Sequence, residues 1–193
     1  MSRVKPGSHP PGPPERWQRL RRGIPVDFRV FSVRRDRVRS PRTGRAHDVT
    51  VLEAPDWVNV VALTDRGRVV LVRQFRHGTE ETTLEIPGGA VDASDRSPLA
   101  AAKRELREET GYAARRWTRI GVVDPNPAIQ TNACTTYLAE GAYPAGDADP
   151  DEGEELEVVL VSPARLDALV RSGVIRHSLV IAALHWWKIR GRR

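Results

Sequence analysis

The chain has 193 residues, enough for one domain with a full hydrophobic core and some additional length. Hydrophobic residues make up 39% and charged residues 29%, as in globular proteins, and no apolar run is long enough to cross a bilayer. The basic N-terminus lacks the apolar segment of a secretory signal, and a single cysteine, Cys134, excludes an internal disulfide framework. We therefore expect a cytoplasmic protein without membrane association, in which Cys134 is a buried hydrophobe.

The charge is unevenly distributed. The formal net charge is +6, but the first 50 residues hold 13 Arg and Lys against 4 Asp and Glu, a net of +9, so the remainder sums to −3. Basic segments of this kind contact nucleic acid, membrane surfaces or anionic substrates in some proteins. Arginine supplies all but three of the 31 basic residues, which indicates a compositional bias. We therefore interpret the segment as solvated and do not expect nucleic acid as a partner.

Residues 1 to 22 are predicted to form a disordered, basic, proline-rich tail, with a short basic helix over residues 15 to 22 as an alternative. The predicted domain covers residues 23 to 193. Its first strand-like run, residues 27 to 38, alternates apolar and polar side chains, and a turn separates it from a similar run at residues 48 to 54.

Two β-branched runs follow at residues 57 to 64 and 68 to 76, joined by the hairpin signal "DRGR". The segment "TLEIPGGAVD", residues 83 to 92, leads from a strand into a glycine-rich turn. Two further strand-like runs lie within residues 117 to 143 and are split by a Pro/Asn loop. Strands are therefore predicted both before and after a single helix, which lies between residues 92 and 117.

That helix is predicted over residues 98 to 110, with Ser97 as its cap, Pro98 at its first position and Gly111 beyond its end. One face is apolar and is expected to pack on the core; its residues are Leu99, Ala102 and Leu106. Helices are also predicted at residues 162 to 173 and 177 to 190, after an acidic loop and a strand at residues 156 to 162. The absence of a regular βαβ repeat indicates an α+β protein with a mixed-sheet sandwich.

Three glutamates gather on the first helix. Glu105 and Glu109 are one turn apart on one face, and Glu108 lies beside them. Clustered carboxylates need a positive partner to remain ionised, and the hard cations Mg²⁺ and Mn²⁺ prefer oxygen ligands. A solvated surface helix with Glu/Arg pairs is the alternative. The preceding Gly-Gly turn favours a cation site, because glycine permits close approach of the backbone to a ligand.

The segment "GGAVDASDRSPLAAAKRELREETGY", residues 88 to 112, resembles the signature of the Nudix hydrolases, G-x5-E-x7-R-E-U-x-E-E-x-G-U, where U is aliphatic or bulky and apolar. "RELREETGY" matches the second half, with Tyr112 as the last apolar residue, and Gly89 matches the first glycine. The family glutamate falls on Asp95, and eight residues rather than seven separate it from Arg104. We interpret this as a one-residue insertion in the loop "ASDRS", which leaves the role of Asp95 open.

The order of the surrounding motifs is similar to that of the ADP-ribose pyrophosphatase-like branch. This resemblance implies the Nudix fold, an α/β/α sandwich with a mixed β-sheet between helices and an N-terminal strand extension. Members of this branch often exchange N-terminal strands, so the strands within residues 26 to 54 are expected to serve in a homodimer.

The resemblance implies metal-dependent hydrolysis of a nucleoside diphosphate linked to another moiety, most simply ADP-ribose or a related nucleotide sugar, giving NMP and a sugar phosphate. The cofactor would be Mg²⁺ or Mn²⁺. Glu105 and Glu109 would be direct ligands, Glu108 a ligand directly or through water, and the carbonyl of Gly88 a further oxygen ligand. Arg104 would orient a glutamate of the motif.

In this branch the general base often comes from a mobile acidic loop, where Glu155 and Glu154 are the candidates ahead of Glu152. For substrate binding the resemblance implies Arg76 in preference to Arg73, because the family's Q-x-R pattern falls on Gln74 and Arg76, and it also implies Glu85. Trp57 is expected to stack on a base, with sheet packing as the alternative. The Pro/Asn loop adds polar groups able to read a sugar or a base edge, namely Asn126, Gln130 and Asn132.

Two other functions are compatible with the same motif. One is the hydrolysis of an RNA end or an NAD cap, which the basic N-terminal half favours. The other is a non-enzymatic Nudix domain that senses a nucleotide. Such domains tend to lose glutamates of the motif, and this sequence keeps all three on its helix.

Overall fold

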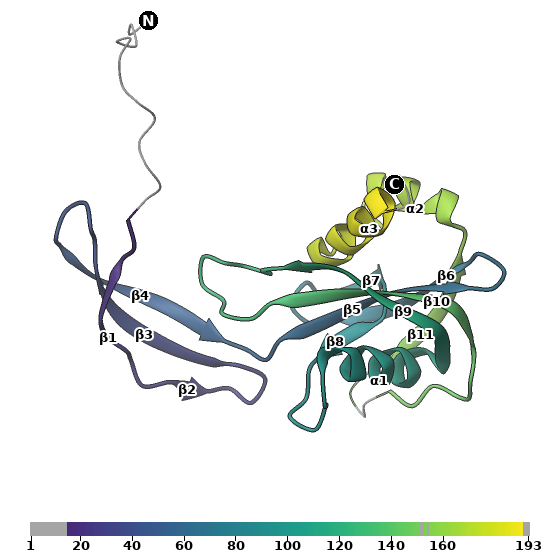
Figure 1. Ribbon diagram of the computed structural model, residues 1–193, viewed down its shortest axis with the longest axis horizontal. Helices are drawn as coiled ribbons and strands as arrows, with labels where there is room; N and C mark the ends of the chain where they lie inside the picture. Colours follow the sequence, from purple (N-terminus) through teal and green to yellow (C-terminus); the bar gives the residue numbers. More distant parts are fainter. Residues whose placement is uncertain (1–14, 151–152, 154, 191–193) are drawn as a thin grey trace, which may run out of the picture. The chain divides into compact units, whose positions relative to one another are not determined.

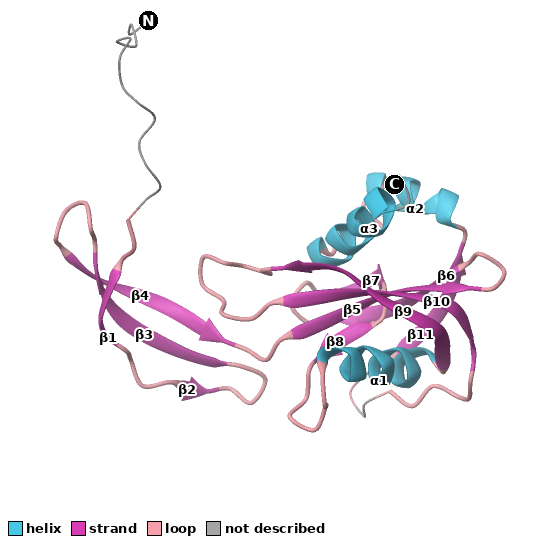
Figure 2. Ribbon diagram, in the orientation of Figure 1, coloured by secondary structure: helices cyan, strands magenta, loops and turns pink. Residues whose placement is uncertain are grey.

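The computed structural model describes residues 15 to 150, 153 and 155 to 190. The chain divides into two compact units, Met1–Glu53 and Ala54–Arg193, which are treated separately below. Figure 1 traces their elements along the chain, and Figure 2 shows strands in both units and helices in the second. Within the described ranges, no helix combines the length and apolar character needed to span a membrane.

The first unit is a four-stranded antiparallel sheet. Its strands are β1 (Gln18–Arg21), β2 (Val26–Asp27), β3 (Ser32–Arg39) and β4 (Ala46–Glu53), and β3 pairs with the other three. Strand β1 occupies part of residues 15 to 22, so both the helix considered there and a disordered tail reaching residue 22 are wrong for these positions. Pairing with β3 fixes this basic segment as a strand, and residues 1 to 14 lie outside the described part.

The run predicted as one strand over residues 27 to 38 is broken. Asp27 Oδ1 accepts a hydrogen bond from the backbone N–H of Arg29 (2.8 Å), and Arg29 has a φ of 69°. Aspartate side chains favour such local turns, and a residue with positive φ cannot continue a strand. The chain therefore reverses between β2 and β3, which pair with each other.

Charged side chains are buried in the first unit. Arg34 and Asp36 are 7% and 3% exposed, and Arg34 Nε donates to both Asp36 oxygens (3.0 and 3.2 Å). Asp36 also accepts from the N–H of Gly23 (2.9 Å), and Arg34 pairs with Glu53. The predicted alternation is thus present in β3, but its buried side is charged, and several large apolar side chains of the unit stay exposed: Trp17, Ile24, Val26, Phe28 and Val30.

The second unit is an α/β/α sandwich, as predicted. Its sheet consists of β5 (Trp57–Thr64), β6 (Val69–Arg76), β7 (Glu81–Glu85), β8 (Gly88–Ala90), β9 (Tyr112–Val123), β10 (Cys134–Pro144) and β11 (Leu156–Val161). The main order is β11-β6-β5-β10-β9, with β7 on β6 and β8 on β5. Strand β10 is parallel to β5 and the other pairs are antiparallel, so the sheet is mixed.

Helix α1 (Pro98–Thr110) covers one face of this sheet, and α2 (Pro163–Arg171) and α3 (Ser178–Arg190) cover the other (Figure 1). Strand β5 is buried on both faces. Val58 and Val60 belong to the core cluster of α1, and Val61 belongs to that of α3. Complete burial of each valine stabilises the fold by roughly 1.5–3 kcal/mol. Strand β5 therefore packs against both helix layers and determines where each of them lies.

Helix α1 has the predicted bounds because its start and stop signals are local. Ser97 Oγ accepts a hydrogen bond from the N–H of Ala100 (3.2 Å), and Pro98 occupies the first turn. Gly111 adopts the left-handed conformation (φ 71°) that ends many helices, and its N–H donates to the carbonyl of Arg107 (2.8 Å). Leu106 is fully buried, which fixes the rotation of the helix and the direction of its glutamates.

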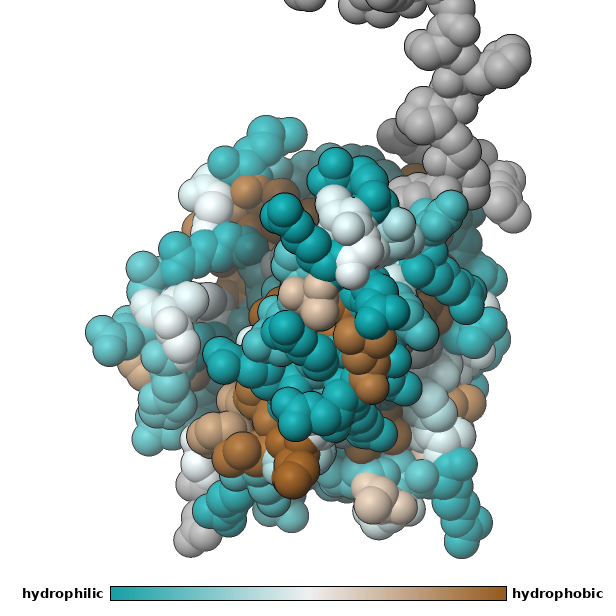
Figure 3. Space-filling model, turned by 90° about the vertical axis from the view of Figure 1, so that its left-hand side faces the viewer, coloured by the Kyte–Doolittle hydropathy of each residue, from teal (hydrophilic) through white to brown (hydrophobic). Residues whose placement is uncertain are grey.

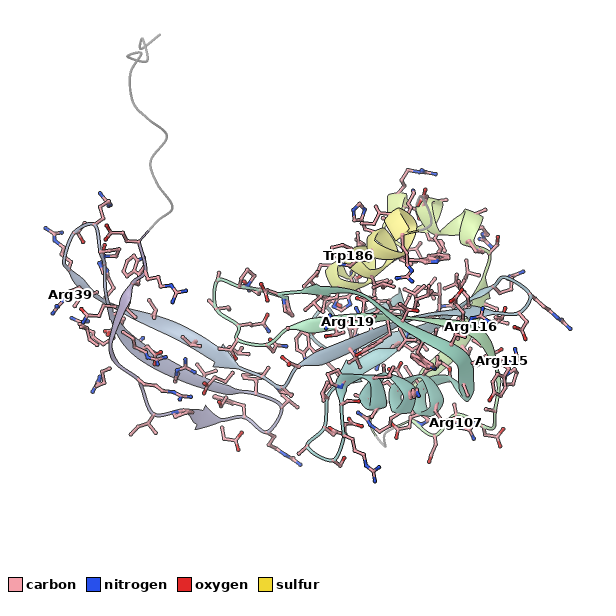
Figure 4. All side chains as sticks on the ribbon, in the orientation of Figure 1. Arg39, Arg107, Arg115, Arg116, Arg119 and Trp186 are labelled. Atoms are coloured by element: carbon pink, nitrogen blue, oxygen red, sulfur yellow. The ribbon has the colours of Figure 1, made fainter. Side chains whose placement is uncertain are left out.

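Helix α3 is docked on β9 through an aromatic contact. A Cβ atom added to Gly121 would lie 2.4 Å from the indole ring of Trp186, so the ring packs directly on the glycine backbone. Figure 4 shows Trp186 on α3, and Arg115, Arg116 and Arg119 on β9. Trp186 is accordingly a packing residue within the second unit.

Candidate functional site

Two of the three glutamates meet strand β8. The backbone N–H of Gly88 donates to Glu109 Oε2 (3.0 Å), and Glu109 is 3% exposed. A Cβ atom on Gly89 would lie 2.5 Å from Glu105 Oε1, so the absence of a side chain there lets the carboxylate reach the strand. Since β8 pairs with β5, helix α1 and the glycine turn are held on one support.

Arg104 connects the glutamates to the loop before the helix. Its Nη1 lies 2.9 Å from Glu108 Oε2 and 3.0 Å from Glu105 Oε1, and its Nη2 donates to the carbonyl of Ala90 (2.9 Å). Its hydrogen bond to Asp95, with these carboxylates, raises the pKa of Arg104 above its ordinary value, despite burial. The predicted pairing of Arg104 with a motif glutamate is present, and the guanidinium partly neutralises the acidic cluster.

Asp95 closes the loop that departs from the family spacing. Its Oδ2 accepts from the backbone N–H of Asp92 (2.9 Å) and from Arg104 Nη2 (3.0 Å), and its Oδ1 lies 3.3 Å from Arg104 Nε. The hydrogen bond from Arg104 lowers the pKa of the Asp95 carboxyl, against the opposing effect of burial. The shorter acidic side chain therefore still reaches Arg104, because the loop folds back between residues 92 and 95.

The fit of a divalent cation follows from these contacts. In the described ranges, no group of three or more His, Cys, Asp or Glu side chains already converges as a metal cluster. The carboxylates of Glu105 and Glu109 nevertheless lie at the same two glycines, and carboxylate oxygens are the ligands that hard cations prefer. The donor set therefore fits Mg²⁺ or Mn²⁺, which suit oxygen ligands better than zinc does.

A cavity of about 660 Å³ adjoins the same glycines. Its wall includes Gly88 and Gly89, with Arg76, Glu85 and Trp57 among the other residues. Three predicted substrate-binding residues and the predicted carbonyl ligand are thus brought together. Glu105 and Glu109 adjoin the cavity through the glycines that they contact.

Glu85 organises one wall of this cavity. It is 2% exposed and receives Arg76 Nε on Oε1 and Arg76 Nη2 on Oε2, both at 3.0 Å. Thr83 Oγ1 donates to Oε1 (2.5 Å), and His177 Nδ1 lies 3.1 Å from Oε2. Burial alone raises the pKa of Glu85, but the hydrogen bonds from His177, Arg76 and Thr83 outweigh it and hold that pKa well below its ordinary value.

Other predicted residues lie elsewhere. Arg73 forms an ion pair with Glu157 on the exposed side of β6 and β11, which leaves Arg76 as the arginine of this segment at the cavity. Glu155 is exposed immediately before β11, whereas Glu154 and Glu152 lie outside the described residues. The polar residues of the Pro/Asn loop are not in the cavity wall; they are Asn126, Gln130 and Asn132.

Sequence reasoning missed several residues of the cavity wall, among them Asn59 and His177. Asn59 lies on β5 and donates through Nδ2 to the carbonyl of Leu179 (3.2 Å), which ties the first turn of α3 to the sheet. His177 immediately precedes α3 and reaches Glu85. No local sequence pattern links these residues to the glycine turn, because packing of α3 on β5 brings them there.

The fold, the glycine turn and the carboxylate helix together define a Nudix domain. The family model described as NUDIX domain matches residues 55–184, and the chain belongs to this family. The chain is 31% identical over 148 residues to the ADP-ribose pyrophosphatase of Bacillus subtilis (strain 168), covering 76% of this chain and 80% of that protein. This similarity confirms the predicted branch.

Two further similarities agree with this assignment. The ADP-ribose pyrophosphatase of Mycobacterium tuberculosis (strain ATCC 25618 / H37Rv) is 31% identical over 156 residues, covering 80% of this chain and 75% of that protein. A crystal structure of an ADP compounds hydrolase superposes with a TM-score of 0.82 at 22% identity, covering 94% of this chain and 98% of the other. The latter likeness confirms the fold.

Proposed function

We propose that the protein is a Nudix pyrophosphohydrolase that cleaves ADP-ribose or a related nucleotide sugar into AMP and a sugar phosphate. The observation that carries this proposal is the sharing of Gly88 and Gly89 between the glutamates of α1 and the cavity. Carboxylates that can hold a cation and a pocket of substrate size thus adjoin the same backbone. The names of the related ADP-ribose pyrophosphatases support the substrate class.

Glu105, Glu108, Glu109 and the carbonyl of Gly88 would hold the cation, for which we propose Mg²⁺ or Mn²⁺. Nudix hydrolases generally use a divalent metal, which neutralises phosphate charge and acidifies a water molecule when bound. Arg104 sets the directions of the Glu105 and Glu108 carboxylates through its hydrogen bonds. It therefore serves to preorganise the ligand set.

Arg76 is the proposed phosphate-binding residue. Its side chain is 41% exposed and lies in the cavity wall, and Glu85 fixes its guanidinium by paired contacts. A guanidinium held in one orientation loses little entropy when it binds phosphate oxygens through paired N–H groups. Trp57, in the same wall, is proposed to stack on the base.

Glu155 is the proposed general base, with Glu154 as the second candidate. Leu156, next to Glu155, is in register with Gln74 of β6, and Arg76 lies at the end of that strand. Glu155 therefore immediately precedes β11, which pairs with β6, and β6 ends at Arg76 in the cavity wall. Replacement of each glutamate in turn by glutamine would show which of the two is the base. Loss of the base should lower kcat more than it changes KM.

The test is turnover of ADP-ribose, ADP-glucose and ADP-mannose with Mg²⁺ or Mn²⁺, followed by detection of AMP. Chelation is expected to abolish turnover, and addition of the metal to restore it. Glu109→Gln should remove activity while circular dichroism and the unfolding midpoint stay near those of the wild type. Glu140→Gln is the matched control, because Glu140 lies on β10 away from the cavity wall. Full activity in Glu109→Gln would refute the ligand assignment.

We also propose a homodimer formed through the first unit, and a cytoplasmic location. The unit exposes large apolar side chains, including Trp17, Ile24 and Phe28. Figure 3 shows hydrophobic patches among hydrophilic surface on the face that it draws. Burial of such side chains favours association. Sedimentation equilibrium of the whole chain tests this, and a monomer at micromolar concentration would contradict it.

The two alternative functions predict different results in the same assays. A nucleotide sensor would be stabilised by the compounds without turning them over. An RNA-end or NAD-cap hydrolase would prefer capped RNA, with binding that weakens as salt is raised.

A further inference from the structure

His177 contributes a polar atom to the cavity wall that the proposed hydrolysis does not yet use. Its side chain is 42% exposed, and it immediately precedes α3. The turn is anchored on both sides, because His177 contacts Glu85 and the carbonyl of Leu179 accepts from Asn59. The imidazole is therefore held in place before any substrate arrives.

The contact with Glu85 determines how the two ring nitrogens are used. A carboxylate that is ionised only accepts hydrogen bonds, so Nδ1 of His177 must carry the proton in this contact. Nε2 has no protein partner in the described part of the chain. It is thus the ring atom available to a ligand in the cavity.

Glu85 itself is saturated. Two carboxylate oxygens offer about four hydrogen-bonding positions, and contacts from Arg76, Thr83 and His177 use four. Glu85 is also almost fully buried. It therefore acts on a substrate through the side chains that it orients, and Arg76 and His177 are the two that lie in the cavity wall.

A sugar hydroxyl matches Nε2 better than a phosphate does. The hydroxyl donates to Nε2 when the imidazole is neutral and accepts from it when the imidazole is charged, whereas a phosphate oxygen fits only the charged form. Neighbouring Arg176 also lies in the wall, but its guanidinium is paired with Glu81. The turn before α3 therefore offers a ring nitrogen that can bind a sugar hydroxyl, beside the proposed phosphate-binding Arg76.

We propose that His177 is a specificity-determining residue that binds a hydroxyl of the substrate's second sugar through Nε2, while Glu85 holds its Nδ1. This inference rests on the proposed function and deepens it. It assigns recognition of the phosphates to Arg76 and recognition of the sugar to the turn before α3, two groups joined by one buried carboxylate.

Two substitutions distinguish a direct contact from a structural role. In His177→Asn the amide replaces the Nδ1 position next to Glu85, and Nε2 is lost. In His177→Gln the amide replaces the Nε2 position, and the contact with Glu85 is lost. His185→Asn is the matched control, because His185 is exposed on α3 and outside the cavity wall.

With ADP-ribose, His177→Asn should raise KM about 3- to 10-fold with little change in kcat, as expected for loss of one hydrogen bond. His177→Gln, whose amide keeps a polar atom at the Nε2 position, should raise KM less than His177→Asn does, and His185→Asn should remain within about 2-fold of the wild type. With ADP β-methyl ester, which has the diphosphate but no second sugar, all variants should behave alike. Binding of the α,β-methylene analogue of ADP-ribose, measured by calorimetry, should follow the KM values.

The failure of this inference is distinguishable from failure of the proposed function. If the wild type turns over ADP-ribose but His177→Asn has the same KM, or loses equally on both substrates, the sugar contact is refuted and the hydrolase stands. A greater loss in His177→Gln than in His177→Asn would show a role confined to Glu85. A wild type that neither hydrolyses nor binds any nucleotide sugar would overturn both.

Discussion

Asp95 and Arg104 form a paired contact in which Oδ1 and Oδ2 of the carboxylate face Nε and Nη2 of the guanidinium, at 3.3 and 3.0 Å. The same guanidinium contacts Glu105 and Glu108. The loop that departs from the Nudix spacing is thereby joined to the carboxylates proposed to hold the metal. A change in that loop is expected to alter the site without any direct contact with substrate.

Asp95→Ala tests this connection. The substitution should destabilise the fold by about 1 kcal/mol, because it removes the hydrogen bonds to Arg104 and to the N–H of Asp92. Activity should fall as well, because Arg104 would lose the carboxylate that holds its guanidinium in position against Glu105 and Glu108. Asp92→Ala is the control, because Asp92 is exposed and lies 3.4 Å from Arg104. Equal kcat/KM values for the two variants at a given metal concentration would contradict the prediction.

Gly89→Ala tests the close approach at β8. The new Cβ atom would lie 2.5 Å from Glu105 Oε1, so the carboxylate must move while the fold adapts cheaply. A displacement of this kind is expected to lower kcat/KM between about 10- and 100-fold. Gly78→Ala is the control in the same cavity wall, because nothing lies within 4 Å of its added Cβ. Thermal unfolding of both variants, measured beside the kinetics, separates the local effect from a loss of fold.

Glu85→Gln tests the organiser of the cavity wall. The amide keeps one acceptor oxygen but turns donors toward Arg76 and His177, so we expect a destabilisation of roughly 1.5–3 kcal/mol and a higher KM for ADP-ribose. Thr83→Val provides a comparison that removes a single donor to the same carboxylate. If Glu85 were dispensable, its substitution would change KM no more than that of Thr83.

The same carboxylate gives the protein a specific dependence of stability on pH. The folded-state pKa of Glu85 is below its ordinary value of 4.5, so the unfolded chain binds a proton first as the solution is acidified. The stabilisation by ionised Glu85 is therefore complete above the pKa of Glu85 in the unfolded chain. It is lost as pH falls from there through the lower pKa of Glu85 in the folded protein. Urea unfolding between about pH 3 and pH 7 should show a difference between wild type and Glu85→Gln that shrinks in acid. A constant difference would contradict this.

The thiol of Cys134 is expected to be unreactive in the folded protein. Burial, and secondarily the charge of Asp56, raise the pKa of its thiol to about 12, so the reactive thiolate is scarcely formed at neutral pH. A thiol-reactive disulfide reagent should label the protein only after denaturation. Rapid labelling of the native protein would show that β10 opens more readily than its buried position indicates.

The sequence predicted those features whose causes are local. Helix α1 has the predicted bounds because Ser97, Pro98 and Gly111 act within one turn of its ends, and β5 was recognisable from its β-branched run. The break between β2 and β3 was missed because one side-chain hydrogen bond, from Arg29 to Asp27, outweighs the alternating pattern. The loop around Asp95 matches the motif only approximately. The hydrogen bonds of Asp95 that close this loop could be seen only in the structure.

Some residues of the cavity wall were harder to predict than the glutamates. Glu105, Glu108 and Glu109 are neighbours on one helix, so the spacing alone gathers them. His177 and Asn59 reach the cavity only because α3 packs on β5. The placement of such residues depends on tertiary packing, which a local pattern does not contain.

The hydrogen bond from Asn59 to the carbonyl of Leu179 has a consequence for how such a protein diversifies. The proposed metal ligands lie in one continuous segment from the glycine turn through α1, whereas the proposed sugar contact comes from the turn before α3. The two can be exchanged separately. We therefore expect that substitutions in the few residues before α3 can change the sugar preference without changing the hydrolytic reaction. The hydrogen bond from Asn59 would hold the altered turn in position.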